Sequence, residues 1–190
     1  CRLGELRSAL EEIVGRELSP ASFVPREDGE TALEFSAKRK FSVCFGAARS
    51  AADGNFELCG DRVCRAERPD GYFYAVICDG MGTGYDASLA SGKCGIFLRR
   101  MLTAGMSAET ALTMLNEILR ADSDECSVSL DLLRIDLLSG EASLYKSGAA
   151  PTYLRRGGKV FPIDAPGVPI GILSEPELTR SDFTIRAGDL

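Results

Sequence analysis

The central stretch of the sequence, residues 72–84, reads YFYAVICDGMGTG. Its first seven residues are aromatic, β-branched or small apolar types, which favour a buried strand. An Asp-Gly pair and a glycine-rich turn follow at once. The sequence therefore predicts a hydrophobic strand that delivers the carboxylate of Asp79 into a tight turn.

Two helices are predicted directly after this turn. Small and apolar residues recur at helical spacing over 87–104, and Gly105 is well placed to end that helix. A second helix is predicted over 108–119, where Ser107 can cap the first turn and Glu109 suits the helix dipole.

Strand patterns lie on both sides of these helices. Upstream, a helix is predicted over 3–18, a polar turn-rich segment over 22–28, and two strands of one antiparallel sheet over 33–37 and 40–46. Downstream, alternation and turn signals predict strands over 127–137, 142–147, 152–155, 160–163 and 181–185. Helices and strands in separate blocks indicate the α+β class.

Composition limits the function classes. A net charge of -6 and a pI near 4.9 argue against nucleic acid as a partner, because such binding needs a basic face. No stretch approaches the ~18 consecutive apolar residues of a membrane span. The seven cysteines, among them Cys44 and Cys78 in apolar runs, indicate reduced core residues, and the chain has no histidine to complete a zinc site with Cys59 and Cys64.

Asp79 is the first candidate site residue. A carboxylate at the end of a buried strand is unfavourable unless a cation neutralises it, and Mg²⁺ or Mn²⁺ could do so with help from the Gly80 carbonyl. Two alternatives stay open at this point. Asp79 could simply hydrogen-bond the glycine turn, or Gly82 and Gly84 could cradle a phosphate, although the lysine of a phosphate-binding loop is missing.

Several blocks read together resemble the PPM, or PP2C-type, phosphatase family. They are Gly60-Asp61, residues 77–84, and Ala87 with Ser91. Further blocks at 129–137, 148–157, 169–172 and 187–190 are similar to the sporulation-specific members. The resemblance covers residues 41–190 as a phosphatase domain and, more weakly, residues 1–40 as an N-terminal regulatory helix and linker region.

The resemblance implies a fold and a site. The fold would be an α-β-β-α sandwich of two antiparallel sheets flanked by helices, incomplete at its C-terminus. Asp79 would be the catalytic residue and would bridge two Mn²⁺ or Mg²⁺ ions. The Gly80 carbonyl would bind one ion, and Asp61 would bind the second directly or through water. A bound water would then attack phosphorus in line, without a phosphoenzyme.

Two departures from the family pattern qualify this expectation. The family's further metal-binding acidic residues would lie beyond Leu190, so we expect the chain alone to bind metal poorly and to be inactive. Met81 stands where eukaryotic members carry a histidine that can act as general acid, so water or the metal would assist the leaving group.

The resemblance also suggests a biological role. The substrate would be a phosphorylated anti-anti-sigma factor, whose dephosphorylation activates a sporulation sigma factor. The domain would be cytoplasmic and could form a homodimer, and the parent protein would be anchored in the membrane by a region outside this chain. The alternatives are a non-catalytic signalling or docking module of phosphatase shape, and an unrelated metal-dependent hydrolase of small phosphate esters.

Other polar residues are expected to have ordinary roles. Asp136 and Asp189 are predicted to be turn residues, whereas Asp131 is left open between a strand surface and a ligand. Solvated positions are predicted for Ser91, Lys93, Arg99, Arg100, Arg155 and Arg156. The alternatives are a phosphate contact for Ser91 or Lys93 and an acidic protein partner for one of the arginines.

Overall fold

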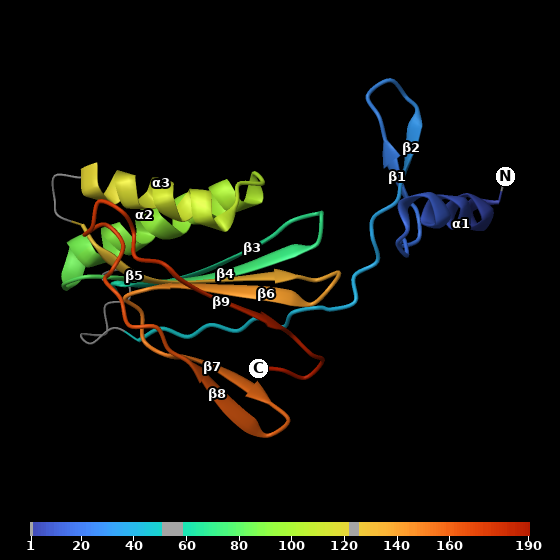
Figure 1. Ribbon diagram of the computed structural model, residues 1–190. Helices are drawn as coiled ribbons and strands as arrows, with labels where there is room; N and C mark the ends of the chain where they lie inside the picture. Colours follow the sequence, from blue (N-terminus) through green and yellow to red (C-terminus); the bar gives the residue numbers. More distant parts are fainter. Residues whose placement is uncertain (1, 51–58, 122–125) are drawn as a thin grey trace.

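The computed structural model describes residues 2–50, 59–121 and 126–190. Its elements are α1 (Leu3–Val14), β1 (Ser22–Pro25), β2 (Thr31–Glu34), β3 (Asp61–Glu67), β4 (Tyr72–Gly80), α2 (Gly84–Thr103), α3 (Ala108–Ala121), β5 (Val128–Asp136), β6 (Glu141–Ser147), β7 (Thr152–Arg156), β8 (Lys159–Ile163) and β9 (Thr179–Thr184) (Figure 1). Among the described residues, no helix combines the length and apolar character needed to cross a membrane.

The centre of the molecule is a five-stranded antiparallel sheet with strand order β3-β4-β5-β6-β9. Helices α2 and α3 cover one face of this sheet, and the β7–β8 hairpin lies on the other side (Figure 1). A third antiparallel pair, β1–β2, stands away from the sheet beside α1. The predicted α+β class with antiparallel sheets and flanking helices is confirmed.

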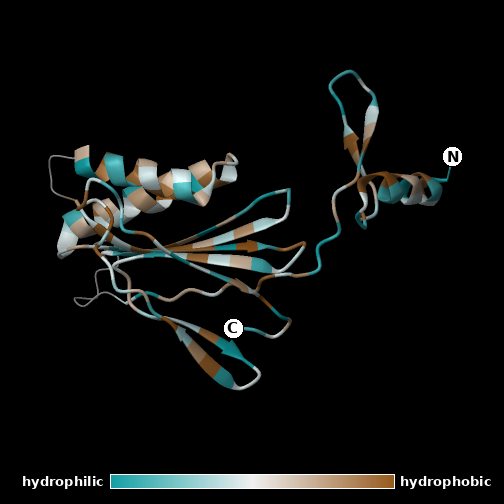
Figure 2. Cartoon of the chain, viewed as in Figure 1, coloured by the Kyte–Doolittle hydropathy of each residue, from teal (hydrophilic) through white to brown (hydrophobic). Residues whose placement is uncertain are grey.

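The main hydrophobic core lies between the sheet and the two helices. Alternate residues of β4 and β5, such as Val76 and Leu130, point into it and meet Leu98 of α2 and Leu115 of α3. All four side chains are at most 1% exposed. Burying such a side chain contributes about 1.5–3 kcal/mol, so this layer fixes α2 against the end of β4. Figure 2 shows the apolar stripes on the strands that produce it.

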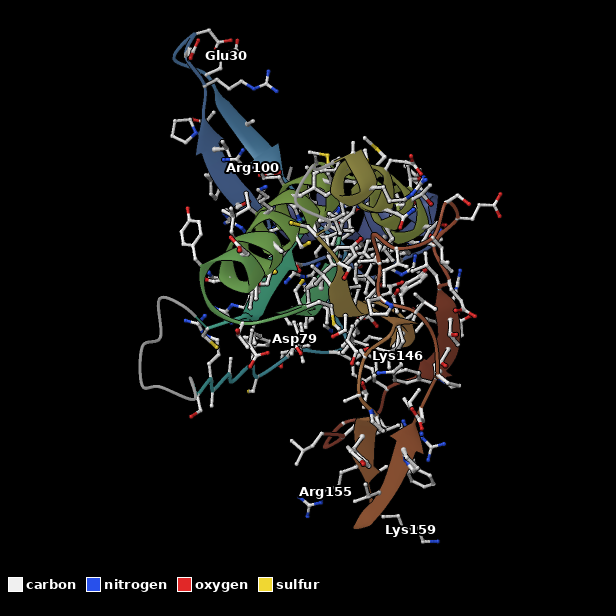
Figure 3. All side chains as sticks on the ribbon, turned by 90° about the vertical axis from the view of Figure 1, so that its left-hand side faces the viewer. Glu30, Asp79, Arg100, Lys146, Arg155 and Lys159 are labelled. Atoms are coloured by element: carbon white, nitrogen blue, oxygen red, sulfur yellow. The ribbon has the colours of Figure 1, made fainter. Side chains whose placement is uncertain are left out.

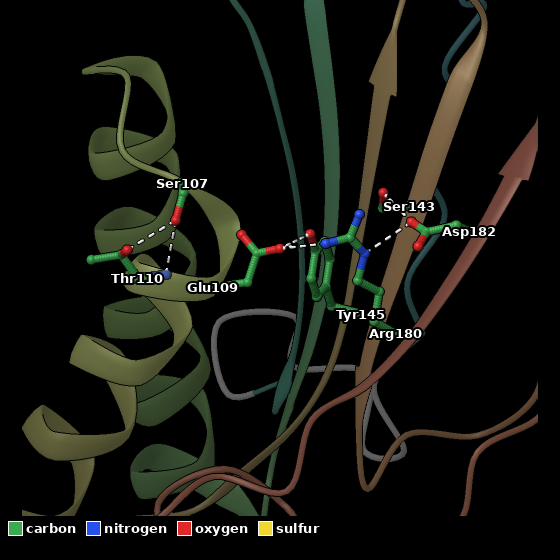
Figure 4. A network of polar contacts seen from close by, with 7 residues as sticks. All are labelled: Ser107, Glu109, Thr110, Ser143, Tyr145, Arg180 and Asp182. Carbon is green, nitrogen blue, oxygen red and sulfur yellow. Dashed lines mark hydrogen bonds and ion pairs between the residues drawn. The ribbon is translucent and has the colours of Figure 1, made fainter.

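A polar network ties α3 to the far edge of the sheet (Figure 4). Ser107 caps α3 as predicted, since its Oγ accepts from Thr110 N at 3.1 Å. Glu109, one residue into the helix, accepts from the Tyr145 hydroxyl and from Arg180 Nη1. Burial, and then the neighbouring Glu109 carboxylate, raise the pKa of Tyr145 to about 12. The hydroxyl therefore stays protonated and keeps its role as a donor.

The opposite face of the sheet is less completely covered. Phe73 and Ile135 form a smaller cluster on it, packed by Phe41 and Phe45. Between this face, β7 and the C-terminal residues lies a mainly apolar cavity of about 540 Å³. The metal-binding residues predicted from the sequence lie on this same face.

Three predictions for the N-terminal half are wrong. The first helix ends at Val14 rather than at residue 18, because Gly15 adopts the left-handed conformation (φ 65°) and caps it. Residues 22–25 form strand β1, not a turn, and pair with β2. Residues 40–46 form no strand and do not pair with 33–37. Their alternation instead reflects the packing of Phe41, Val43 and Phe45 on the sheet.

The structure also differs from the sequence predictions at strand β3 and at one cysteine. The sequence placed residues 61–67 after a loop without assigning a strand, because charged residues at Asp61, Arg62 and Arg65 obscure the apolar alternation. The structure pairs the whole segment with β4. Cys78 is a free, buried core residue as predicted, but Cys44 is exposed. The predicted loop at residues 51–55 lies outside the described residues.

Candidate metal-binding site

Asp61 and Asp79 meet at one end of the central sheet. They are directly opposite each other in the β3–β4 register. Residues opposite each other in an antiparallel pair project to the same face, and this face lies opposite α2 and α3. Figure 3 shows Asp79 below α2 and apart from the hairpin that carries Arg155 and Lys159. The structure therefore brings the two predicted carboxylates together.

Gly80 allows helix α2 to pack closely against the end of β4. A Cβ on Gly80 would lie 2.1 Å from the carbonyl oxygen of Ala87, so only glycine allows α2 to approach the strand end this closely. Gly80 N donates to Gly60 O at 3.1 Å, and Met81 N donates to Ser127 O at 3.0 Å. These bonds fix the backbone directly after Asp79.

Gly60 leaves an open cradle beside the carboxylates. A Cβ at Gly60 would lie 3.3 Å from both Ala87 Cβ and Gly80 O, and 3.6 Å from Asp79 Oδ1. A carbonyl oxygen and a carboxylate oxygen thus border the space that a side chain would otherwise fill. Both are hard oxygen donors of the type that Mg²⁺ and Mn²⁺ prefer.

The electrostatics of the pair also suit a cation. Burial, then the charge of Asp61 and the hydrogen bond with Asp61, raise the pKa of Asp79. Within the described part of the chain, neither carboxylate has an ion pair with a lysine or arginine. A bound divalent cation would relieve this repulsion. The alternative that Asp79 serves the glycine turn has less support, because its side-chain partner is Asp61.

The candidate metal site contains few protein ligands. No group of three or more His, Cys, Asp or Glu residues suited to a metal occurs among residues 2–50, 59–121 and 126–190. Mg²⁺ is commonly bound through one or two carboxylates while it keeps several waters. Asp61, Asp79 and the Gly80 carbonyl therefore fit a cation that remains partly hydrated.

The remaining acidic residues lie in other networks. Asp136 accepts from Leu138 N at 2.8 Å and is a turn residue, as predicted. Asp189 accepts from Arg186 N in a turn, as predicted, and also forms an ion pair with Arg156 at 2.6 Å, so Arg156 is not simply solvated.

Ser91 also departs from its predicted solvated position. It is fully buried in α2, and its Oγ donates to Ser88 O at 3.2 Å. Lys93, Arg99, Arg100 and Arg155 are exposed as expected.

Two basic residues near the site were not identified from the sequence. Arg49 Nη1 donates to the backbone carbonyl of Asp61 at 3.1 Å, which places its guanidinium beside the backbone of β3 at Asp61. Lys146 is buried in β6 and paired with Asp131. Neither could be found by periodicity, since both depend on contacts between different segments of the chain.

The raised pKa of Asp79 predicts a pH effect on the metal-free protein. The native state holds the proton more tightly than the unfolded state, so the unfolding free energy falls as pH rises through the raised pKa. It recovers as pH falls towards the unfolded value near 3.9. We expect the stability of Asp79→Asn relative to wild type to decline as the pH is lowered from 7 to about 4. Urea midpoints measured in chelator check this, and a difference that is constant across that range would contradict it.

Comparison with known proteins adds independent findings. The family model described as "Stage II sporulation protein E (SpoIIE)" matches residues 69–190. The chain is 31% identical over 167 residues to stage II sporulation protein E of Bacillus subtilis. The aligned region covers 87% of this chain and 20% of that protein. The chain thus spans about a fifth of the length of this curated relative.

Solved structures agree with the fold. The structure of the PP2C phosphatase domain and a fragment of the regulatory domain of SpoIIE from Bacillus subtilis aligns with a TM-score of 0.79 and 26% identity, over 97% of this chain and 56% of that one. RsbX, solved in complex with magnesium, aligns with a TM-score of 0.58 and 16% identity, over 70% of this chain and 63% of that one. The second likeness shows the fold alone.

Proposed function

Because the chain belongs to the stage II sporulation protein E family of PP2C-type serine phosphatases, we propose that it carries part of the active site of a metal-dependent protein serine phosphatase. The observation that supports this most directly is the Asp61–Asp79 pair beside the Gly60 cradle. Two neighbouring carboxylates that have no ion pair with a lysine or arginine among the described residues suit a site that binds divalent metal ions.

The proposed mechanism assigns each residue a role. Asp61, Asp79 and the Gly80 carbonyl would hold the divalent ions, Mn²⁺ or Mg²⁺. Ions held in this way acidify a bound water and stabilise the charge of the transferring phosphoryl group. The backbone bonds of Gly80 and Met81 hold the Asp79 carboxylate in place for this task.

We propose a phosphorylated anti-anti-sigma factor as the substrate, with release of a sporulation sigma factor as the outcome. The membership in a sporulation family supports this, and the net charge of -6 disfavours nucleic acid as the partner. A cytoplasmic location, homodimerisation and anchoring of the parent protein outside this chain belong to the same proposal.

The test is phosphate release from a phosphoserine anti-anti-sigma protein, with Mn²⁺ varied and chelator as the blank. Metal-dependent release supports the phosphatase. Partner binding without release, in the chain and in a longer protein that contains it, would favour a docking module. Turnover of small phosphate esters at low KM, with phosphoproteins ignored, would indicate a different hydrolase.

Arg49 is proposed to contact the phosphate of the substrate. Its guanidinium is anchored on the Asp61 carbonyl, and arginine has five N–H donors that suit phosphate oxygens. Since a hydrogen bond to a charged group contributes about 1.5–3 kcal/mol, we expect Arg49→Ala to lower kcat/KM by roughly ten- to a hundred-fold. Steady-state kinetics on the phosphoprotein check this. Arg100→Ala, an exposed arginine on α2, is the matched control, and equal kinetics for both variants would refute the role.

A further inference from the structure

A buried ion pair lies on the same face of the central sheet as Asp61 and Asp79. Lys146 of β6 is directly opposite Asp131 of β5. Its Nζ donates to Asp131 Oδ1 at 2.6 Å, and the two side chains are 1% and 14% exposed, respectively. Lysine is almost never buried to this degree unless it is paired. The position of this charge is therefore set by the fold.

The surroundings of the pair complete a closed network. Lys146 Nζ also donates to Ala150 O at 2.7 Å and to Thr152 Oγ1 at 3.0 Å. Thr152 Oγ1 in turn donates to Asp131 Oδ2 at 2.7 Å. The ammonium thus has three acceptors, and each carboxylate oxygen has a donor. The network as a whole carries no net charge.

The register brings this network close to the candidate metal site. Asp79 is opposite Ser129, and Ile77 is opposite Asp131, so Asp131 is the diagonal neighbour of Asp79 on the same face. Such diagonal positions are about 7–8 Å apart. An unneutralised charge on Asp131 would attract a divalent cation bound at Asp79. In a water-like medium this attraction would raise the affinity of the site for the cation about five-fold.

Stability alone does not account for a lysine here. The neighbours of the pair on this face include the apolar side chains of Leu133 and Leu144, which line the same cavity as Asp131. Replacing a buried ion pair by apolar residues of similar volume is often neutral or stabilising. The chain instead places a lysine here, where it cancels a carboxylate beside the site.

We propose that Lys146 is a positioning residue for the divalent cation. By binding Asp131 it keeps this carboxylate from competing for the ion, so that the cation is held by Asp61 and Asp79. The inference rests on the proposed metal-dependent function and deepens it, because it names the residue that sets the charge at the site.

The test is a double-mutant cycle read out by metal binding. Affinity for Mn²⁺ alone is measured, on a longer protein that contains this chain, from the electron paramagnetic resonance signal of the free ion. We expect Lys146→Met to tighten binding about five-fold, and Asp131→Asn, which leaves the lysine charge, to weaken it by a similar factor. The double variant should return to the wild-type affinity. Lys159→Met, an exposed lysine on β8, is the matched control and should not differ from wild type.

The outcomes separate this proposal from the function on which it rests. Equal affinities in Asp131→Asn and wild type, or weaker binding in both single variants, would overturn the proposal. If Lys146→Met does not fold, because it leaves a buried carboxylate unpaired, Asp131→Asn and the double variant decide the question, with circular dichroism as the folding check. In the longer protein, Mn²⁺ binding without phosphate release would overturn the phosphatase function alone, and no Mn²⁺ binding by the wild type would overturn both.

Discussion

Asp79→Asn is expected to abolish metal-dependent phosphate release while leaving the fold intact. The carboxylate would lose its charge at the point where the metal ions are proposed to bind. Since metal ions supply several kcal/mol of transition-state stabilisation, and each 1.36 kcal/mol is a factor of ten, we expect kcat/KM to fall by about a thousand-fold or more. Phosphate release with saturating Mn²⁺ measures this in an active protein that contains the chain.

The fold should tolerate this substitution because the wild-type pair is repulsive. The charge of Asp61 raises the pKa of Asp79, so an amide removes an unfavourable contact. The side chain is largely exposed, so the stability gain without metal should stay below about 1 kcal/mol. Asp164→Asn, an exposed carboxylate next to β8, is the control and should keep full activity. An active Asp79→Asn protein would remove Asp79 from the centre of the mechanism.

Gly80→Ala is expected to be the most destabilising single methyl addition at the site. The new Cβ would lie 2.1 Å from Ala87 O and 2.8 Å from Ala87 C, both backbone atoms that cannot rotate away. Helix α2 would have to move off the end of β4. We expect a loss of about 3 kcal/mol in unfolding free energy, the upper end for overpacking. Urea unfolding measures it.

Gly82→Ala is the matched comparison for this prediction. Gly82 has a φ of 93°, but a Cβ there would meet nothing within 4 Å. Its cost is therefore limited to backbone strain, about 1–2 kcal/mol. If the two variants were equally stable, the close approach of α2 to Gly80 would not be what holds this corner of the fold.

The local pattern of the sequence was sufficient for much of the site's scaffold. The apolar run that ends in Asp79-Gly80 predicts β4 and the turn after it, and helical spacing predicts α2 and α3 close to their observed bounds. These signals succeed because side chains of neighbouring residues report directly which face of a strand or helix is buried. The later strands and their hairpins follow for the same reason.

The local pattern does not predict which segments of the chain pair or pack together. The alternation of residues 40–46 predicts a strand, although these side chains pack on the sheet without backbone pairing. Strand β3 was missed because its charged residues lie along an edge of the sheet. Ser91 was expected in solvent but faces the core. In each case a distant segment decides the environment.

The hydrophobic strand that ends in Asp79-Gly80 and the two helices after it are predictable from local sequence, because these features depend on the order of neighbouring residues. The position of Asp61 opposite Asp79, and of Lys146 opposite Asp131, arises from strand pairing in the folded protein. Both arrangements depend on the strand register, because a shift of one residue in a strand would turn its side chains to the other face of the sheet. The charge at the candidate site is therefore a property of the folded sheet, which no local stretch of the chain contains.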